Sequence, residues 1–556
     1  MENRRFILAL VLSFIVFLVY ARFFAPQTPK QPAAPEGEKQ EAVSQKPAPA
    51  AVKPEAVVAK IRKAAQGKDI VVETDLVRVV LSTAGGVVKH WELKQYREAK
   101  KEEVGVTALF RKLTSGKKEE KPKRELGNVQ LLPSYDESAA GETAAPLAVV
   151  PLNKALSALG QVEFRADRGG TRLDAGNPSG TITFTYAGPG GIAVEKRLTF
   201  HHDEYRVDVE VKTRGLDGYT LSLGTDFGLA DKVSSDASGR VGLAALLDGK
   251  TVTEKIEKIK GETQHAGSLE WFGQEDKYFT AAIIVGGQGI VTARRVSAPK
   301  ETGDLLTTEL TVKEKPEART FTLYAGPKIY TVLKTSGHGM ERMVDFGWFT
   351  VLAKPMFWLM RQFYAVFQNY GIAIILLTIV VRILLFYPSL KSALAMEEMK
   401  AIQPQLLTVR EKYKKDPQRM NQEMMKLYKE HKVNPLGGCL PMVLQLPFFV
   451  ALYNVLNVSI ELRQAPFISF WIKDLSVYDP FYILPVLMGV SMVVTMKMTS
   501  TTADPQQAKM MMYMNVAFIF LFAWLPAGLL LYITLSNVLS IVQQILVRRR
   551  VAAIAR

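Results

Sequence analysis

Cysteine is nearly absent from this 556-residue sequence, in which Cys439 is the only one. A single thiol excludes an intrachain disulfide, so cysteine usage gives no indication of the redox compartment. The motifs His-Glu-x-x-His and Gly-x-Ser-x-Gly do not occur, which removes two common hydrolase signatures. His201 and His202 are adjacent, and neighbours on a strand point to opposite faces, so they do not form a metal-binding pair. We therefore expect no covalent chemistry, no cofactor and no metal.

One short segment resembles part of a nucleotide site. Residues 246–251, LLDGKT, look like the end of a phosphate-binding loop, but Ala244 stands where that loop has its first glycine. Asp-Gly between two apolar segments is also a common β-hairpin turn. The hairpin is the favoured interpretation. The sequence then contains no motif for binding a nucleotide and shows no energy source of that kind.

Methionine and aromatic residues are missing from long stretches of the chain. Apart from the first residue, every methionine lies at or after Met340, and no aromatic residue occurs between Phe24 and Trp91. Residues 26–66 are rich in Pro, Ala, Glu, Lys and Gln. This composition cannot bury a core and predicts a disordered linker.

An apolar segment precedes this linker. Residues 6–24 are nearly all apolar, follow Arg4 and Arg5, and lack an Ala-x-Ala cleavage site. A signal peptide and an uncleaved anchor are the two interpretations, and the length and missing site favour the anchor. We assign residues 1–25 to a transmembrane anchor whose N-terminus lies in the cytoplasm, because positive residues favour that side.

Residues 67–337 show the alternation of polar and apolar side chains that is typical of strands. Residues 181–186 (TITFTY) and 206–212 (RVDVEVK) alternate strictly. Residues 281–295 (AAIIVGGQGIVTARR) predict two strands joined by a glycine-rich turn. We expect an all-β domain, most simply a large sandwich.

Apolar segments dominate the chain after residue 338. Within residues 338–370, the aromatic-rich segment 346–367 contains Lys354 and Arg361, which indicates a helix lying at the membrane interface. Residues 371–547 form a predicted five-span core. Its spans are expected at residues 371–387, 441–460, 481–498, 511–524 and 528–547.

Charge is distributed unevenly between the loops of this core. Residues 389–438 contain ten Lys/Arg and six Asp/Glu, whereas residues 461–479 contain two and three. The tail, residues 548–556, is basic and short. The positive-inside rule then predicts six spans in all, with both termini in the cytoplasm and the β domain in the periplasm of a double-membrane bacterium. Residues 389–438 predict a cytoplasmic helical hairpin whose first arm is broken at Pro404.

The predicted spans lack acidic residues, yet one of them contains Arg382. An arginine at the centre of a membrane helix costs about 2.5–3.5 kcal/mol and normally faces a bundle interior or a water-filled cavity. Thr378 lies one turn earlier on the same helix face. We expect Arg382 to lie in a wet, positively charged pocket.

Other polar residues in the spans are candidates for the walls of this pocket. Gln445 is an isolated amide in its span, and Tyr532 and Ser536 belong to a polar stripe on the last span. Interhelical hydrogen bonds, worth ~0.6 kcal/mol each, are the alternative explanation for each of these residues. Methionines at 488, 492 and 496 repeat every four residues and serve either as packing or as a soft binding wall. A wet groove with one positive charge and soft walls suits a protein substrate that is entering the membrane.

Four segments resemble the YidC/Oxa/Albino family of membrane protein insertases. They are NPLGGC (434–439), ELRQAPF (461–467), DPFYILPVLMGV (479–490) and PAGLLLYITLSN (526–537). The anchor and the β domain fit the Gram-negative form of the family. The resemblance implies a hydrophilic groove, open to the cytoplasm and to lipid, in which Arg382 has Thr378, Gln445 and Tyr532 as neighbours. It also implies that the outer domain is similar to sugar-binding supersandwich folds without known catalysis.

This resemblance implies an inner-membrane insertase and chaperone that works without ATP. Its expected partners are nascent membrane proteins, membrane lipid and the Sec translocon, with no nucleic acid. Ribosome contact is expected to be weak, because the tail at residues 548–556 offers no long basic segment.

Two alternatives to an insertase have to be considered. A small-solute transporter would need coupled ionisable residues or inverted repeats, and the sequence shows neither. A membrane-tethered glycan-binding or glycan-processing protein would need paired carboxylates in the β domain, which its many Asp and Glu residues leave open.

Overall fold

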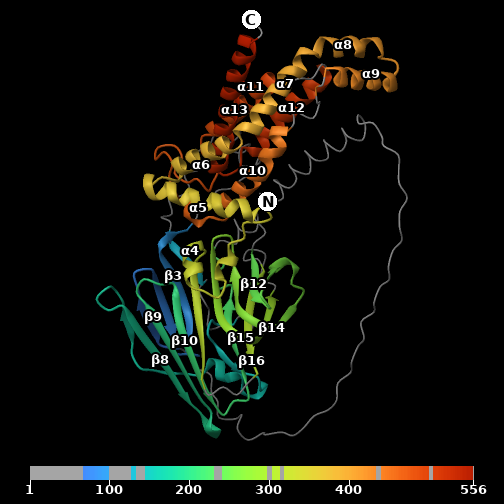
Figure 1. Cartoon of the computed structure of the whole chain (residues 1–556). Helices are drawn as coiled ribbons and strands as arrows, with labels where there is room; N and C mark the ends of the chain where they lie inside the picture. The colour runs from blue at the N-terminus through green and yellow to red at the C-terminus, as the bar shows by residue number, and fades with distance from the viewer. Residues whose placement is uncertain are drawn as a thin grey trace, which may run out of the picture. The chain divides into compact units, whose positions relative to one another are not determined.

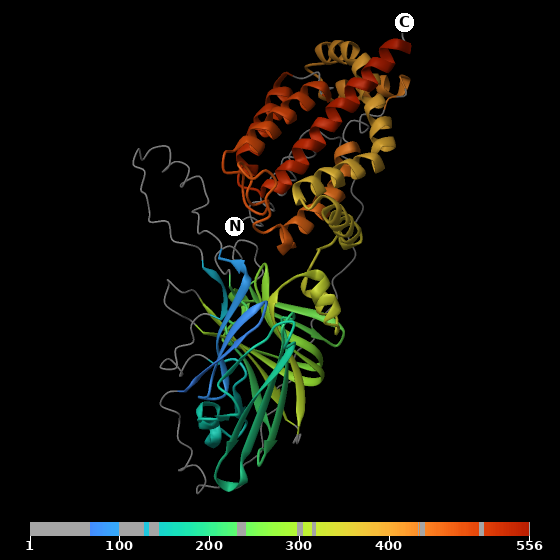
Figure 2. The same ribbon diagram turned by 90° about the vertical axis from the view of Figure 1, so that its left-hand side faces the viewer.

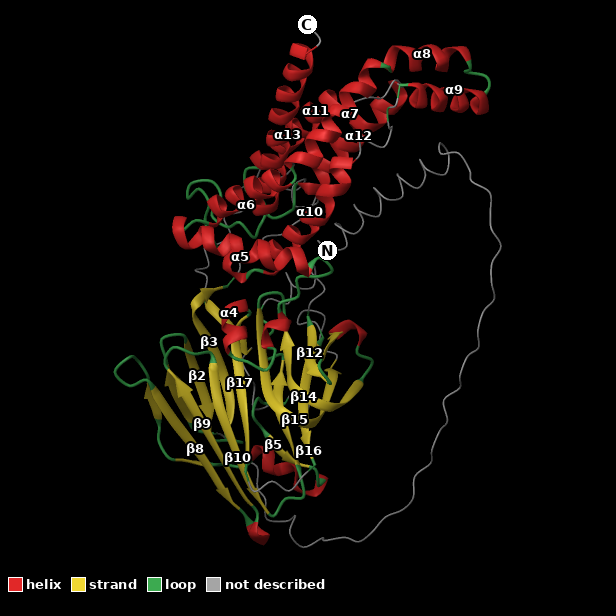
Figure 3. Cartoon of the chain, in the orientation of Figure 1, coloured by secondary structure: helices red, strands yellow, loops and turns green. Residues whose placement is uncertain are grey.

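The computed structural model describes residues 67–98, 127–132, 144–230, 241–296, 304–313, 318–431, 433, 440–499 and 505–554. The predicted anchor and linker therefore lie outside the described residues. The described chain forms two compact units, one ending at Gly326 and the other beginning at Pro327 (Figure 1). The first unit consists mainly of strands and the second of helices, as the colouring of Figure 3 shows.

The strands of the first unit form two sheets. The smaller sheet has the strand order β4-β3-β2-β1-β7. Its strands are β1 (Asp69–Glu73), β2 (Val77–Ser82), β3 (Val87–Arg97), β4 (Asn128–Leu132) and β7 (Gly170–Arg172).

The larger sheet has twelve strands, ordered β13-β12-β14-β15-β17-β10-β9-β8-β6, with β11, β16 and β5 joined beside this path. Their bounds are β5 (Val149–Pro151), β6 (Arg165–Ala166), β8 (Ser179–Ala187), β9 (Ala193–His201), β10 (Arg206–Arg214), β11 (Tyr219–Thr225), β12 (Gly242–Leu247), β13 (Lys250–Lys255), β14 (Glu262–Glu275), β15 (Phe279–Val296), β16 (Leu305–Val312) and β17 (Arg319–Pro327).

The alternating segments of the sequence form strands with one buried face. On β10 the side chains of Val207, Val209 and Val211 are buried, while the residues between them are more exposed. Trp91 on β3 of the smaller sheet lies 5.6 Å, ring centroid to ring centroid, from Phe227, which follows β11 of the larger sheet. The two sheets thus share a core, and the prediction of an all-β domain is confirmed.

The turn predicted within residues 281–295 does not exist, and β15 runs through this segment as one strand. Ile284 is opposite Trp271 and Gly287 is opposite Leu269, so β15 has one residue more than β14 between these pairs. Gly286 takes a positive φ of 61° there. The glycines therefore accommodate a β-bulge, which requires the same backbone freedom as a turn but keeps the strand direction.

The segment LLDGKT is a hairpin turn, as predicted. Leu247 at the end of β12 is opposite Lys250 at the start of β13. The two residues between them, Asp248 and Gly249, both have positive φ angles, 50° and 73°. This pattern is typical of a tight hairpin turn and not of a phosphate-binding loop.

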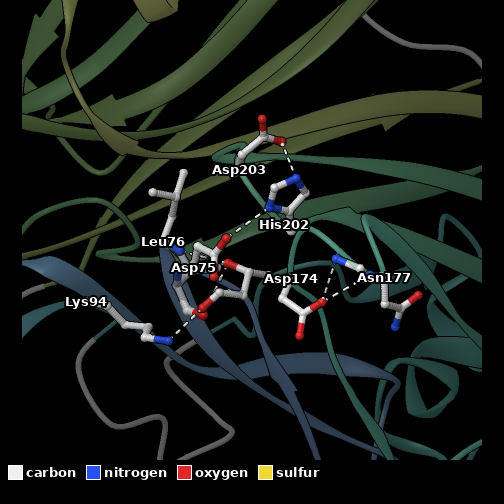
Figure 4. Close-up of polar contacts among 10 residues, drawn as sticks. Asp75, Leu76, Lys94, Asp174, Asn177, His202 and Asp203 are labelled. Atoms are coloured by element: carbon white, nitrogen blue, oxygen red, sulfur yellow. Dashed lines mark hydrogen bonds and ion pairs between the residues drawn. The ribbon is translucent and has the colours of Figure 1, made fainter.

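The two adjacent histidines bind different partners. His201 Nε2 lies 3.2 Å from Asp208 Oδ2. His202 Nδ1 lies 2.9 Å from Asp75 Oδ2, as Figure 4 shows. Among the described residues, no group of three or more His, Cys, Asp or Glu side chains is placed to hold a metal ion. The Asp75 carboxylate, followed by Asp203, raises the pKa of His202 above its usual value, and burial acts against this shift. His202 thereby links the β9–β10 turn to the β1–β2 turn.

A buried cation makes a second link between the two sheets. Lys196 on β9 is 0% exposed, and its ammonium donates hydrogen bonds to the carbonyl oxygens of Gly85 at 2.6 Å, Gly86 at 2.5 Å and Leu147 at 2.9 Å. It also lies 4.9 Å from the centre of the Phe164 ring. Burial lowers the pKa of Lys196 to about 7. No sequence pattern distinguished this lysine from those on the surface.

The second unit is helical. Its helices are α4 (Tyr330–Thr335), α5 (Thr350–Phe367), α6 (Tyr370–Leu384), α7 (Phe386–Ala401), α8 (Gln403–Lys412), α9 (Pro417–Glu430), α10 (Leu440–Val458), α11 (Ile483–Thr499), α12 (Pro505–Phe522) and α13 (Ala527–Ile554). Each segment predicted to span the membrane after residue 371 lies largely on one of these helices. Figure 2 shows α13 as the long red helix of this unit.

Length and apolarity vary among these helices. Within α13, residues 527–549 form the one described helix that is long and apolar enough to cross a membrane by itself. Helices α6 and α7 meet the same requirement only together, as a pair bent by 64°. Shorter apolar segments occupy residues 444–458, 483–498 and 512–522.

The bend between α6 and α7 corrects the predicted span at residues 371–387. The sequence favoured one continuous helix there, but α6 ends at Leu384 and α7 begins at Phe386. Pro388 has no N–H to donate to the carbonyl oxygen of Leu384, and its ring would clash with that carbonyl in a straight helix. The proline thus explains the change of direction.

Helix α5 has the two-sided character expected of an interfacial helix. Ala353 and Met360 are buried, whereas Val351 and Trp358 are exposed. Just before the helix, Trp348 is 99% exposed. An apolar surface of this kind is suited to the headgroup region of a bilayer.

Helices α8 and α9 lie side by side, as Figure 1 shows. Helix α8 begins after the break at Ile402, with Pro404 in its first turn, as the sequence predicts. Asp416 caps α9, because its carboxylate accepts a hydrogen bond of 3.1 Å from the backbone N–H of Arg419. A small apolar cluster holds the pair together and consists of Met399, Ile402, Leu406 and Val433 with Met424, Leu427 and Tyr428 packed against it.

Candidate functional site

Arg382 lies in the last turn of α6 and is directed at α13 and α10. Close packing brings α13 towards α6, because a side chain at Gly528 would come within 3.2 Å of Ile374 Cδ1. The absence of a side chain at Gly528 therefore helps the polar residues of α13 to reach the α6 arginine.

The guanidinium of Arg382 is held by two neutral side chains. Its Nε donates to Ser536 Oγ at 2.9 Å, and one terminal nitrogen donates to Ser536 Oγ and to the Ser536 carbonyl oxygen, both at 2.5 Å. The same nitrogen donates to Gln445 Oε1 at 3.3 Å. Gln445 Nε2 in turn donates to Ser536 Oγ at 2.9 Å. Three helices thus meet in one polar cluster of Arg382, Gln445 and Ser536.

The charge of Arg382 stays uncompensated within this cluster. Its hydrogen bonds within the described parts of the chain all go to uncharged groups. Ser536 is only 1% exposed, so the positive charge lies next to a buried hydroxyl. An acidic group that enters from outside would meet a guanidinium that its neighbours have already oriented. Binding would then cost little further side-chain entropy.

Thr378 and Tyr532 lie close to the cluster, but neither is a hydrogen-bond partner of the guanidinium. Thr378 is buried, and its hydroxyl donates to the Ile374 carbonyl oxygen at 2.6 Å, one turn earlier on the same helix. Tyr532 is buried one turn before Ser536, and its ring centre lies 6.5 Å from that of Phe449. The Tyr532 hydroxyl faces Gln445 and Ser536 and interacts electrostatically with Arg382. Tyr532 therefore belongs to the polar surroundings of the guanidinium.

A small open cavity adjoins Arg382. It is lined by Arg382, Leu385, Ser389, Leu444 and Gln445. Sequence reasoning missed Leu385, Ser389 and Leu444. The available signal was that Ser389 lies seven residues, or about two helical turns, after Arg382. The bend between α6 and α7 hid this relationship.

Two other polar residues of the predicted spans, Asn515 and Asn537, make contacts between helices. Asn537 donates to Ser491 Oγ at 3.1 Å, and Ser491 donates to the Met488 carbonyl oxygen at 2.6 Å. Asn515 Nδ2 lies 3.1 Å from Met496 Sδ. Interhelical hydrogen bonding, the alternative considered from the sequence, thus describes this second group of residues.

Comparison with known proteins identifies the family. The sequence model described as "60Kd inner membrane protein" matches residues 362–553, and the one described as "YidC periplasmic domain" matches residues 118–359. The chain is 36% identical over 570 residues to "Membrane protein insertase YidC" of Geobacter metallireducens, with 99% of each chain covered. The chain belongs to the YidC family of membrane protein insertases.

A second relative gives the same result. A protein of the same description from Syntrophus aciditrophicus is 34% identical over 573 residues, covering 99% of this chain and 100% of that protein. A solved YidC insertase with its first transmembrane domain resolved covers 87% of this chain and 95% of its own, with 18% identity and a TM-score of 0.36. The resemblance found in the sequence is confirmed. The YidC family consists of inner-membrane proteins with a periplasmic domain, and this chain has the corresponding β-sheet domain and C-terminal helices.

Proposed function

We propose that the cavity beside Arg382 is part of a groove through which this chain inserts nascent membrane proteins into the inner membrane. One observation carries the proposal: an arginine on an apolar helix is held by Ser536 and Gln445 and has a cavity at its side. Holding the guanidinium through neutral groups orients it and leaves its charge available. Membrane arginines of this kind mark the paths of polar substrates.

The groove would act by lowering the cost of moving a short polar segment into the membrane. Arg382 attracts acidic residues of that segment, and the hydroxyl of Tyr532 beside it adds a polar group to the groove. Transfer of the substrate's apolar helix into lipid then supplies the driving force, at ~25 cal/mol per Å² of buried apolar surface. This mechanism requires no ATP and no covalent step.

The proposed topology has six spans, with both termini and the α8–α9 hairpin in the cytoplasm. Residues 1–25 form the anchor, 26–66 the linker, 67–337 the β domain, 338–370 the interfacial region and 371–547 the core, before the tail at 548–556. The excess of Lys and Arg at residues 389–438 supports this orientation. A reporter fused after Arg419 should behave as cytoplasmic, and periplasmic activity of this reporter would refute the topology.

The exposed side chains of the helical unit fit contact with membrane lipid. Large apolar side chains are exposed on α6, α11, α12 and α13, as lipid contact requires, including Ile383, Leu384, Val486, Val490, Phe520, Val538 and Leu546. We include the Sec translocon as a partner, as the resemblance to the insertase family implies, and ribosome contact as a weaker one. The β domain is expected to be dispensable for insertion, because it has a core of its own.

Reconstitution separates this function from its rivals. The full-length chain in nucleotide-free liposomes should insert a small membrane protein with an acidic translocated segment, measured by protease protection. Solute flux without insertion would support a transporter instead, and glycan cleavage would support a periplasmic enzyme. Failure of insertion at a normal density of correctly folded chain would refute the proposal.

A further inference from the structure

Helix α7 packs against α13 along a narrow seam. Close to the bend, Ser389 Oγ donates to Gln543 Oε1 at 3.2 Å. Further along, Ala393 and Met396 form a small buried cluster with Val547. A seam with so few buried side chains stabilises the position of a helix only weakly.

A charged group of three residues, which we name the α7 clasp, closes the far end of this seam. Glu397 Oε1 accepts hydrogen bonds from Lys400 Nζ at 2.7 Å and from Arg548 Nε at 3.1 Å. Lys400 Nζ and a terminal nitrogen of Arg548 also donate to the Met498 carbonyl oxygen, both at 2.5 Å. The clasp of Glu397, Lys400 and Arg548 therefore joins α7, α13 and the end of α11.

The chemistry of the clasp explains why it needs a carboxylate. Met498 belongs to the last turn of α11, where carbonyl oxygens lack partners within the helix and the helix dipole attracts cations. Two cations converge on this single oxygen and repel each other. Glu397 lies between them and offsets their repulsion. Its side chain is 24% exposed, so water reaches the clasp and the link can open.

The residues at the start of α7 line the cavity beside Arg382. The bend at Leu385 turns α7 by 64° from α6, and the residues around this bend, Leu385 and Ser389, form one wall of the cavity. The opposite wall, Leu444 and Gln445, belongs to α10. A rotation of α7 about the bend would therefore move one wall and leave the other in place.

We propose that Glu397 is a positioning residue for insertion: it clasps α7 to α11 and α13 and thereby keeps the wall of the Arg382 cavity in place. This inference rests on the proposed function of the cavity. Glu397→Gln keeps the shape of the side chain but leaves Lys400 and Arg548 without a counter-charge. The clasp then opens, α7 moves about the bend, and the cavity widens.

The first test measures the cavity without any substrate. Full-length chain carrying Cys439→Ser and Leu444→Cys has its single thiol at the cavity wall that does not move. Its rate of reaction with a bulky, charged maleimide reports how open the cavity is. Loss of one charge-assisted hydrogen bond shifts an open–closed equilibrium by about tenfold, so Glu397→Gln should raise the rate by up to this factor. Glu398→Gln, which removes the neighbouring exposed carboxylate, should not change it.

The second test measures insertion with the same variants at equal membrane levels. Glu397→Gln should slow insertion several-fold. Glu397→Asp keeps the carboxylate within reach of two flexible cations. It should therefore show the normal rate of insertion and the slow maleimide labelling of the unmodified clasp. Equal labelling of the Glu397→Gln and Glu398→Gln chains would overturn the proposal, as would faster labelling with normal insertion. Failure of insertion in the unmodified chain would overturn the proposed function, while the labelling rates would still decide whether Glu397 holds the cavity wall.

Discussion

Arg382 and Ser536 are separated by 154 positions in the sequence, yet two nitrogens of the guanidinium donate to the Ser536 hydroxyl, at 2.9 and 2.5 Å. The contact fixes the direction of the guanidinium. The contact does not neutralise the positive charge of the guanidinium, because serine is uncharged. Orientation and charge can therefore be tested separately.

The charge of Arg382 is tested by comparing lysine with alanine. Lysine keeps the positive charge but loses the planar fork. We expect Arg382→Lys to retain much of the insertion of an acidic substrate, and Arg382→Ala to lose it. A substrate with a neutralised segment should be affected less by either change. Insertion of the two substrates, measured side by side in liposomes, provides the readout.

Stability should change little in the alanine variant. Ser536 and Gln445 keep their own hydrogen bond of 2.9 Å when the guanidinium is removed, and no carboxylate is left without its cation. Equal failure of Arg382→Lys and Arg382→Ala on the acidic substrate would show that the fork and not the charge matters. Normal insertion by Arg382→Ala would show that the cavity is not the groove.

Ser536 tests orientation. Its hydroxyl accepts hydrogen bonds from Arg382 and Gln445, so Ser536→Ala should leave the charge in place but poorly directed. We expect insertion of the acidic substrate to fall less than in Arg382→Ala. Ser540→Ala, one turn further along α13, is the matched control and should insert normally. An equal loss in both serine variants would point to a general defect of α13.

The sequence predicted a polar pocket around Arg382 because an arginine among apolar residues has few stable environments. The family resemblance added Thr378, Gln445 and Tyr532 as neighbours, and in the structure Gln445 and Ser536 are the residues that bind the guanidinium. Thr378 shares the helix face but binds its own backbone at Ile374. Helical periodicity predicts on which face of a helix a side chain lies, but not which group that side chain binds. It therefore could not show that Thr378 does not bind the guanidinium.

Features that depend on distant packing were beyond the sequence. The glycines within residues 281–295 fit a turn and a bulge equally well, and only the pairing of β15 with β14 decides between them. Pro388 signalled a break in the helix but not the side to which α7 bends. Lys196 became a link between two sheets because residues 111 and 49 positions away come to it. No local pattern contains that information.

His202 should titrate above the usual pKa of histidine. Asp75 contributes most to the raised pKa, and Asp203 and Asp174 add to it (Figure 4). A raised folded-state pKa means that the stabilisation is fully present below the unfolded-state pKa of about 6.5 and is lost as the pH rises through the folded value. The link between the β1–β2 and β9–β10 turns should therefore loosen on the alkaline side.

Nuclear magnetic resonance of labelled histidine provides the measurement for His202. Asp75→Asn should lower its pKa towards the usual value. Asp208→Asn, which removes the partner of His201 instead, is the control and should leave the pKa of His202 nearly unchanged. An unshifted His202 in the unmodified chain would contradict the ion pair in solution.

Lys196 should give the β domain a stability that increases with pH. Burial sets its folded-state pKa at about 7, below the unfolded value of 10.5. Between these values the unfolded chain binds one more proton than the folded chain, so the free energy of unfolding rises from pH 7 towards pH 10.

Lys196→Met removes both this titration and the hydrogen bonds to Gly85, Gly86 and Leu147. At pH 9 the loss should be about 1–3 kcal/mol, the cost of buried carbonyl groups left without a donor. At pH 6 the loss should be smaller, because the unmodified chain there carries the cost of a buried charge. Denaturant unfolding of both chains, followed by the fluorescence of buried tryptophans of the β domain, measures the difference at each pH. A difference between the two chains that stays constant from pH 6 to pH 9 would show that the three carbonyl oxygens hold the ammonium charged throughout this range.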